Sequence, residues 1–354
     1  MTSSGSDEHA LLRHHGDVDA EPGLLDFAVN VRGARPPGWL RDRLVAAVDR
    51  LGTYPSAADD LAAREAVAAR HGRSADQVMI LNGSAEGFAL LPRLKPRLAA
   101  LVHPSFTEPE VALRTADVPI HRVLLDPADG YALHLELVPD DADLVVLGNP
   151  TNPTSTLHPR DTVRALARPG RVLLVDEAFM DAIPGEPESL AADADTSGLL
   201  IFRSLTKTWA VPGLRAGYAL AAPELLAELG VDRPQWPVGT LVLEAVRACS
   251  EPRALLHAES DAVEIAEQRI ELTAALKDLG VEVNEPASAP YVLVRVPDGE
   301  RVREGLRARG IAVRRGDTFP GLGPDHLRIA VRDRDQCAPL LAALTAELSV
   351  EVTR

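Results

Sequence analysis

Short apolar runs without polar alternation recur along the chain and alternate with helical stretches between residues 50 and 240. The runs occupy residues 78–81, 98–102, 144–147, 172–175, 199–202 and 217–221. In runs such as LVVL and VLLV neither face of a strand is polar, which indicates strands that are covered on both faces. We therefore expect an α/β fold in which a mainly parallel sheet is sandwiched between helices.

The sequence also predicts helix ends and a second unit. Residues 56–71 follow a helical pattern, with Ser56 as a possible N-cap and Gly72 placed to end the helix. After about residue 250, one long helical stretch precedes four short strand candidates, an intervening helix and a final helix, which is the pattern of a smaller α+β domain. We expect an N-terminal arm over 1–23 that is flexible or loosely docked, a large domain over 50–244, and a small domain built from 24–49 plus 245–354.

Charge and composition exclude several classes of protein. The 52 acidic residues exceed the 37 basic ones, giving a net charge of −15 that argues against binding nucleic acid or an anionic membrane. No apolar run approaches the roughly 18 residues of a membrane span, and the N-terminus lacks the apolar segment of a signal peptide. Two cysteines are too few for a disulfide framework or a zinc site, and the histidines near the N-terminus lack ligand spacing. We expect a cytoplasmic protein without a metal.

Only three lysines occur in the chain, and one of them has an unusual setting. Lys95 and Lys277 lie in a turn-like stretch and near a helix end, where solvated lysines are common. Lys207 ends a predicted buried strand and precedes a loop containing Pro212 and Gly213. Desolvation there would lower its pKa and free its amine for Schiff-base chemistry. A structural lysine at a strand end is the alternative.

Three further segments place polar groups after predicted strands. Asp176 follows a central strand, at the edge where α/β enzymes bind ligands, and could keep a pyridinium nitrogen protonated; capping the next helix is the alternative. Asn152 lies in a proline-rich turn, where its amide can donate to a phenolate oxygen. The turn over 83–85 lies between a strand and a helix, where exposed amides suit a phosphate.

Together these segments resemble the fold-type I pyridoxal phosphate enzymes of the class I and II aminotransferase group, from about Leu25 to Arg332. The motif SLTKTWAVPGLRAGY implies Lys207 as the lysine that bonds the cofactor and later carries a proton. Asp176 would face the ring nitrogen, Asn152 the ring hydroxyl and Phe106 the ring face. The resemblance implies that the cofactor phosphate is held by Gly83, Ser84, Ala85, Ser204, Thr206 and Arg215.

The same resemblance implies a homodimer and a substrate site. Tyr54 resembles the tyrosine that reaches the phosphate of the partner subunit's cofactor, so the active sites would be shared. Arg328 matches the arginine that grips the substrate carboxylate, a task that suits a bidentate guanidinium. The expected substrate is a small phosphorylated amino acid or amine.

Two branches of the group share most of these motifs. Histidinol-phosphate aminotransferases are one, and the cobalamin-pathway branch of threonine-phosphate decarboxylase is the other. The second resembles this chain more closely at HHGD, at LDFAVNV with Asn30, and at DEAFMDAIPGEPESL with Phe179 where aminotransferases commonly have tyrosine. We therefore predict a threonine-phosphate decarboxylase-like enzyme, with the histidinol-phosphate aminotransferase as the alternative.

The chain departs from the branch pattern at two places. Arg32-Gly33 replaces an Asn-Pro pair, and Ser155 stands where the Asn-Pro-Thr motif usually ends in glycine. Arg32 either contacts a substrate phosphate or is solvated like most surface arginines. The sequence leaves open whether the reaction is decarboxylation or transamination. A cofactor-binding protein without catalysis is a remote alternative.

Overall fold

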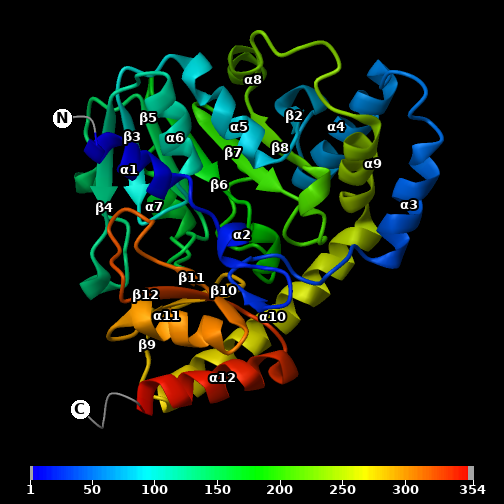
Figure 1. Cartoon of the computed structure of the whole chain (residues 1–354). Coiled ribbons are helices and arrows are strands. Elements are labelled where there is room, and N and C mark those ends of the chain that lie inside the picture. The colour runs from blue at the N-terminus through cyan, green and yellow to red at the C-terminus, as the bar shows by residue number, and fades with distance from the viewer. Residues whose placement is uncertain (1–2, 350–354) are drawn as a thin grey trace.

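Two β-sheets organise the chain, as Figure 1 shows. The computed structural model describes the backbone of residues 3–349 and the side chains of residues 8–349. The first two residues of the expected N-terminal arm therefore lie outside the described residues. Within residues 3–349, no helix is both long enough and apolar enough to cross a bilayer.

The larger sheet has seven strands in the order β2-β8-β7-β6-β5-β3-β4. Strands β3 to β7 pair in parallel, whereas β8 runs antiparallel to both β7 and β2. The strands are β2 (Val78–Leu81), β3 (Ala99–His103), β4 (Ile120–Leu124), β5 (Leu144–Gly148), β6 (Val172–Asp176), β7 (Leu199–Ser204) and β8 (Gly217–Ala221). The predicted mainly parallel sheet is confirmed, and the six expected strands lie within about two residues of their predicted bounds. The edge strand β4 was not expected.

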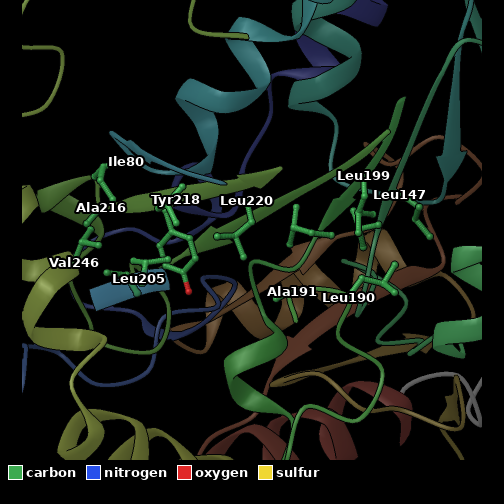
Figure 2. Close-up of a cluster of buried hydrophobic side chains, with 14 of the residues drawn as sticks. Ile80, Leu147, Leu190, Ala191, Leu199, Leu205, Ala216, Tyr218, Leu220 and Val246 are labelled. Atoms are coloured by element: carbon green, nitrogen blue, oxygen red, sulfur yellow. The ribbon is translucent and has the colours of Figure 1, made fainter. Parts of the chain in front are cut away.

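Successive residues of these strands pack into two different cores. On β6, Leu173 and Val175 face one cluster of buried side chains, and Leu174 faces the other. Part of the first cluster is drawn in Figure 2, where Tyr218 and Leu220 of β8 lie among it. Because the strands are buried on both faces, their sequences are continuous runs of apolar residues.

Helices cover both faces of this sheet. The first face is packed by α3 (Gly38–Val48), α4 (Ala57–His71), α7 (Arg160–Arg164) and α9 (Thr240–Cys249), and the second by α5 (Ser84–Leu90), α6 (Glu108–Thr115) and α8 (Pro223–Leu229). Helix α4 begins and ends as its sequence predicts. The Ser56 hydroxyl accepts from the Asp59 N–H at 3.0 Å, and Gly72 ends the helix at φ 64°.

The smaller sheet has five strands in the order β1-β11-β12-β10-β9. Its elements are β1 (Leu25–Phe27), β9 (Glu282–Val283), β10 (Tyr291–Arg295), β11 (Ile311–Arg315), β12 (His326–Ala330), α11 (Gly299–Ala308) and α12 (Arg334–Ser349). The N-terminal β1 pairs in parallel with β11. The long helix α10 (Pro252–Asp278) packs Ala254 and Ala258 into the core of the large sheet and Leu272 and Leu276 into that of the small sheet.

The predicted division of the chain stays a prediction, although several contacts bear on it. Strand β1 belongs to the small sheet, as a small domain that includes residues 24–49 requires. Leu40 of α3, however, lies in the core of the large sheet. The N-terminal region also differs from the expected loosely docked arm: it forms α1 (Ser3–Leu12) and α2 (Gly16–Asp19), and the Thr107 hydroxyl donates to the Leu12 carbonyl at 2.5 Å.

Candidate active site

The carboxyl ends of the parallel strands open into a cavity of about 470 Å³. The register places Gly148 of β5 beside Asp176 of β6, and Asp176 beside Phe202 of β7. Because the strands are parallel, the segments that follow them meet at one edge of the sheet. Of the residues expected at the site, the cavity is lined by Asn30, Ser84, Ala85, Phe106, Asn152, Asp176, Ser204, Thr206, Lys207, Arg215 and Arg328.

Lys207 and Asp176 face this cavity with altered proton affinities. Burial lowers the pKa of Lys207 to about 8, helped by the positive charges of Arg328 and Arg215. Burial raises the pKa of Asp176 to about 7, and a hydrogen bond from the Ala178 N–H at 3.2 Å acts against that shift. The Lys207 Nζ atom lies 5.9 Å from the centre of the Phe179 ring. The site therefore holds an amine that deprotonates near neutral pH beside a buried carboxyl group.

A buried ion pair fixes the chain next to Asp176. The neighbouring side chain of Glu177 accepts from Nε of Arg203 at 2.9 Å and from the Ser189 hydroxyl at 2.8 Å. Arg203 is 1% exposed and also donates to Asp181 at 2.7 Å. Because both charges are fully paired, the end of β6 is held in one position.

A cradle for an anion forms where β8 approaches the turn before α5. Gly83 has φ 76°, and a Cβ atom there would lie 3.2 Å from Nη2 of Arg215. A Cβ atom at Gly217 would lie 2.6 Å from the Arg203 carbonyl oxygen and 3.1 Å from the Ser84 nitrogen, so this close approach requires glycine. Ser204 and Thr206 share a hydroxyl–hydroxyl hydrogen bond of 2.7 Å. The guanidinium, two hydroxyls and the free N–H groups of the first turn of α5 are the donors that a phosphate needs.

Arg328 crosses from the small sheet to the large one. Its Nη1 atom donates to Oδ1 of Asn152 at 2.6 Å, and its Nη2 atom donates to the Ala28 carbonyl. Its Nε atom and both amide atoms of Asn30 are buried and form no hydrogen bond within the described side chains. Buried polar atoms of this kind are costly unless a ligand pairs with them.

Two expected residues lie elsewhere. The Tyr54 side chain is 73% exposed outside the cavity, and its ring stacks on Trp236 with centroids 4.2 Å apart. Arg32 lines a neighbouring cavity of about 490 Å³, which shares Lys207 and Asn30 with the first. Its guanidinium is bound to Glu264 at 2.8 Å and to the Asp261 carbonyl at 2.9 Å.

The cavity also contains residues that the sequence analysis missed. Arg314 of β11 is 2% exposed, and His15 and Asp17 reach the cavity from the N-terminal segment. Arg314 pairs directly with Arg328 in the register of β11 and β12. The pattern IAVRR predicts the strand, but it does not indicate that Arg314, and not Arg315, faces the cavity.

The residues present fit pyridoxal 5′-phosphate. The cradle around Gly83 suits its phosphate, and Asp176 suits a ring nitrogen that must stay protonated. Lys207 supplies an amine that is neutral above about pH 8. Arg328 and Asn30, whose Nε and amide atoms form no hydrogen bond within the described side chains, line the same cavity.

Comparisons with known proteins agree with this geometry. Residues 30–344 match the family "Aminotransferase class I and II". A histidinol-phosphate aminotransferase of Mycobacterium tuberculosis is 53% identical over 338 residues, covering 96% of this chain and 91% of the relative. A threonine-phosphate decarboxylase of Salmonella typhimurium is 32% identical over 331 residues, covering 91% of this chain and 90% of the relative.

Solved structures share the fold. The crystal structure of a histidinol-phosphate aminotransferase from Clostridium acetobutylicum has a TM-score of 0.85 at 24% identity, covering 92% of this chain and all of that one. An aspartate aminotransferase from Thermus thermophilus with maleate has a TM-score of 0.81 at 20% identity, covering 92% of each chain.

The comparisons change which of the two predicted branches is better supported. Three short motifs favoured the decarboxylase branch, but identity over nearly the whole chain is 53% to the histidinol-phosphate aminotransferase of Mycobacterium tuberculosis and 32% to the threonine-phosphate decarboxylase. A short motif reports only a few contacts, whereas full-length identity samples the entire core and site. The alternative of the sequence analysis is thus the better supported one. The chain belongs to the class I and II aminotransferase family, whose cofactor is pyridoxal 5′-phosphate.

Proposed function

We propose that this protein transfers the amino group of a phosphorylated amine of the histidinol-phosphate kind. The observation that carries the proposal is the single cavity in which the Lys207 amine lies with Asp176 and with two buried arginines, Arg314 and Arg328. The 53% identity to a histidinol-phosphate aminotransferase supports this substrate class.

Each group has a task in this proposal. When bound, the cofactor withdraws the electron pair that is left when a bond to the substrate's Cα breaks. The Asp176 carboxylate would accept a hydrogen bond from the protonated ring nitrogen, and the cradle of Gly83, Ser84 and Arg215 would hold the phosphate. The Lys207 Nζ atom would take the proton from the substrate's Cα and hold it for a later return.

The remaining donors orient the ring and the substrate. Asn152 donates its amide to the ring hydroxyl, and Phe106 packs on the ring face. Arg328 would bind the substrate's phosphate or carboxylate through its guanidinium, whose Nη1 atom now contacts Asn152. An anion held there would orient the bonds at the substrate's Cα.

A homodimer with shared active sites is part of the proposal. Tyr54 and Trp236 form an exposed stack, and the neighbouring α3 exposes Val45 and Val48 at 62% and 49%. Exposed apolar side chains gathered in this way mark an interaction surface. A second copy that covers the patch could receive Tyr54 at its own cofactor phosphate.

Both cysteines are free and buried, which fits the reducing cytoplasm.

Decarboxylation of threonine phosphate is the second candidate. That substrate carries two anionic groups, and the cavity offers two buried arginines, Arg314 and Arg328, to receive them. The 32% identity to a threonine-phosphate decarboxylase also supports it. Arg314, however, is already bound to Asp19 at 3.3 Å and to the His14 carbonyl at 2.6 Å, which leaves it less free.

One experiment separates the two candidates. The purified holoenzyme is mixed with histidinol phosphate or with O-phospho-L-threonine, without any oxo acid, and cofactor and products are identified by mass spectrometry. Conversion of the cofactor to pyridoxamine phosphate by histidinol phosphate supports the proposal. Formation of aminopropanol phosphate with unchanged cofactor supports decarboxylation. Absence of both reactions would contradict both, and a Lys207→Ala variant that keeps the physiological activity would indicate a protein without catalysis.

A further inference from the structure

A short N-terminal strap, residues 14–19, spans the cavity mouth between the two sheets. On the large-sheet side, the His15 ring contacts Glu108 at 2.6 Å and lies 5.3 Å from the Phe106 ring. This contact holds the pKa of Glu108 below its usual range. On the small-sheet side, Arg314 donates to the His14 carbonyl at 2.6 Å. Both ends of the strap are therefore anchored.

The strap also lies directly against the substrate arginine. A Cβ atom at Gly16 would lie 2.4 Å from the Ala28 carbonyl oxygen and 3.5 Å from Nη2 of Arg328. The residue after Gly16 is thus placed at the cavity wall by a contact that only glycine permits.

Asp17 is the one strap side chain whose charge has no partner within residues 8–349. His14 and Asp19 bind each other at 3.1 Å, His15 binds Glu108, and Asp19 also binds Arg314. Asp17 is exposed and lines the same cavity as Lys207. The negative charge of Asp17 raises the pKa of Lys207 and so opposes the lowering caused by burial. The two side chains therefore interact electrostatically.

Positive and negative side chains therefore lie in different parts of the cavity. Arg215, Arg314 and Arg328 lie at its anion-binding parts, and Asp17 places an uncompensated acceptor at its mouth. In a substrate whose phosphate binds Arg328, the other substituent on Cα would lie in a different part of the cavity. An ionised carboxylate only accepts hydrogen bonds, so the group that it favours must donate.

Resting on the proposed function, we propose that Asp17 is a specificity residue. It accepts a hydrogen bond from a donating or cationic group on the substrate arm that does not carry the phosphate, such as an imidazole N–H. Hydrogen bonds to a charged group are worth enough to change binding by about 10- to 100-fold. The carboxylate takes no part in the chemical step.

The test compares two substrates that share the phosphate-bearing arm and differ in their ring, which carries a hydrogen-bond donor in only one of them. Half-reaction kcat/KM is measured for histidinol phosphate and for the analogue with a phenyl ring in place of the imidazole. The proteins are the wild-type holoenzyme, Asp17→Asn and Asp17→Leu. Glu21→Gln is the matched control, because Glu21 is exposed nearby, pairs with Arg307 and lies outside the cavity lining. We expect the imidazole preference to fall at least tenfold in Asp17→Leu, less in Asp17→Asn, and not in the control.

A binding measurement makes the result independent of turnover. Calorimetry on the same holoenzymes gives Kd for 2-(imidazol-4-yl)ethyl phosphate and 2-phenylethyl phosphate, which lack an amine and cannot react. A Kd ratio that shifts in Asp17→Leu supports the proposal even if wild-type protein does not turn over histidinol phosphate, a result that would overturn only the proposed function. Kd and kcat/KM ratios within twofold of wild type in Asp17→Leu would overturn the role of Asp17. An equal shift in Glu21→Gln would also overturn it.

Discussion

The Nη1 atom of Arg328 donates to Oδ1 of Asn152 at 2.6 Å, and this bond joins β12 of the small sheet to the turn after β5 of the large sheet. Both residues line the cavity that holds Lys207. A substrate anion would compete with Asn152 for the guanidinium. Substrate binding and the contact between the two sheets are therefore linked through one side chain.

Replacing Arg328 tests this link. Arg328→Lys keeps the positive charge but loses the planar fork, so we expect KM for the phosphorylated amine to rise by about tenfold or more. The affinity for pyridoxal phosphate should change little, because its anchor lies at Gly83 and Arg215. Steady-state kinetics and cofactor titration measure the two effects. Arg295→Lys, on the exposed end of β10, is the control and should behave as wild type.

The lysine prediction has a matched control within the chain. Lys207→Ala should lose turnover by several orders of magnitude together with the visible absorption of bound cofactor, since both depend on its amine. Lys277→Ala should keep both, because Lys277 is exposed and pairs with Glu285. Absorption spectra and single-turnover rates provide the readout. Normal turnover in Lys207→Ala would show that another group carries the proton.

The lowered pKa of Lys207 predicts a pH dependence of stability in the cofactor-free protein. The folded pKa is about 8 and the ordinary value is 10.5, so the unfolded state binds more protons between these values. The free energy of unfolding contributed by this group therefore rises with pH from about 8 to 10.5. The Asp176 pKa of about 7 lies below this window, so that carboxyl group is ionised in both states there.

Urea denaturation of wild type and Lys207→Met across pH 8 to 10.5 isolates this contribution. The difference between the two proteins should change with pH in that window. A difference that is independent of pH would mean that Lys207 is charged in the folded protein.

The close approach at Gly16 predicts a cost for adding one carbon. Gly16→Ala places Cβ where the Ala28 carbonyl lies, so the strap must shift, and we expect a loss of about 1–3 kcal/mol of stability. Hydrogen exchange should also become faster over residues 14–19. Gly38→Ala is the control, because a Cβ atom there meets nothing within 4 Å. Equal stability of the two variants would contradict the tight packing of the strap.

The exposed patch on α3 predicts an effect on assembly. Val48→Glu puts a charge among the exposed apolar side chains of α3 and should shift the protein toward monomer in sedimentation velocity experiments. Ile270→Glu, equally apolar and 67% exposed on α10, should leave assembly unchanged. A wild-type protein that sediments as a monomer at micromolar concentration would rule out the shared-site arrangement.

Much of the large sheet and its helices could be predicted because the signals are local. Residues 78–81 and 217–221 form strands with the predicted bounds. Ser56 caps the start of α4 and Gly72 its end, as expected. The opposite direction of β8 was not predictable, because an apolar run carries no sign of its direction. The helical stretch expected over residues 260–280 begins earlier, at Pro252, because the early turns of α10 contact the large core and lack a simple amphipathic pattern.

The candidate site divides in the same way. Lys207, Asp176 and Asn152 follow apolar strands, so their placement at one sheet edge could be inferred from order alone. Arg314 and Asp17 could not be singled out among many charged residues. Their roles depend on pairing between distant segments: Arg314 is fixed by the strap, and Asp17 by the contact of Gly16 with Ala28.

Helix α10 acts as a lever between the two cores. Its first buried residues, Ala254 and Ala258, belong to the large core, and Leu272 and Leu276 belong to the small one. The distance along the axis from residue 254 to residue 272 is about 27 Å, so a tilt of about 10° at the near end carries the far end by about 5 Å. A tilt of that size would displace the small sheet by a distance on the scale of a substrate molecule. A substitution at Ala254 that tilted the helix would then change how closely Arg328 approaches its ligand.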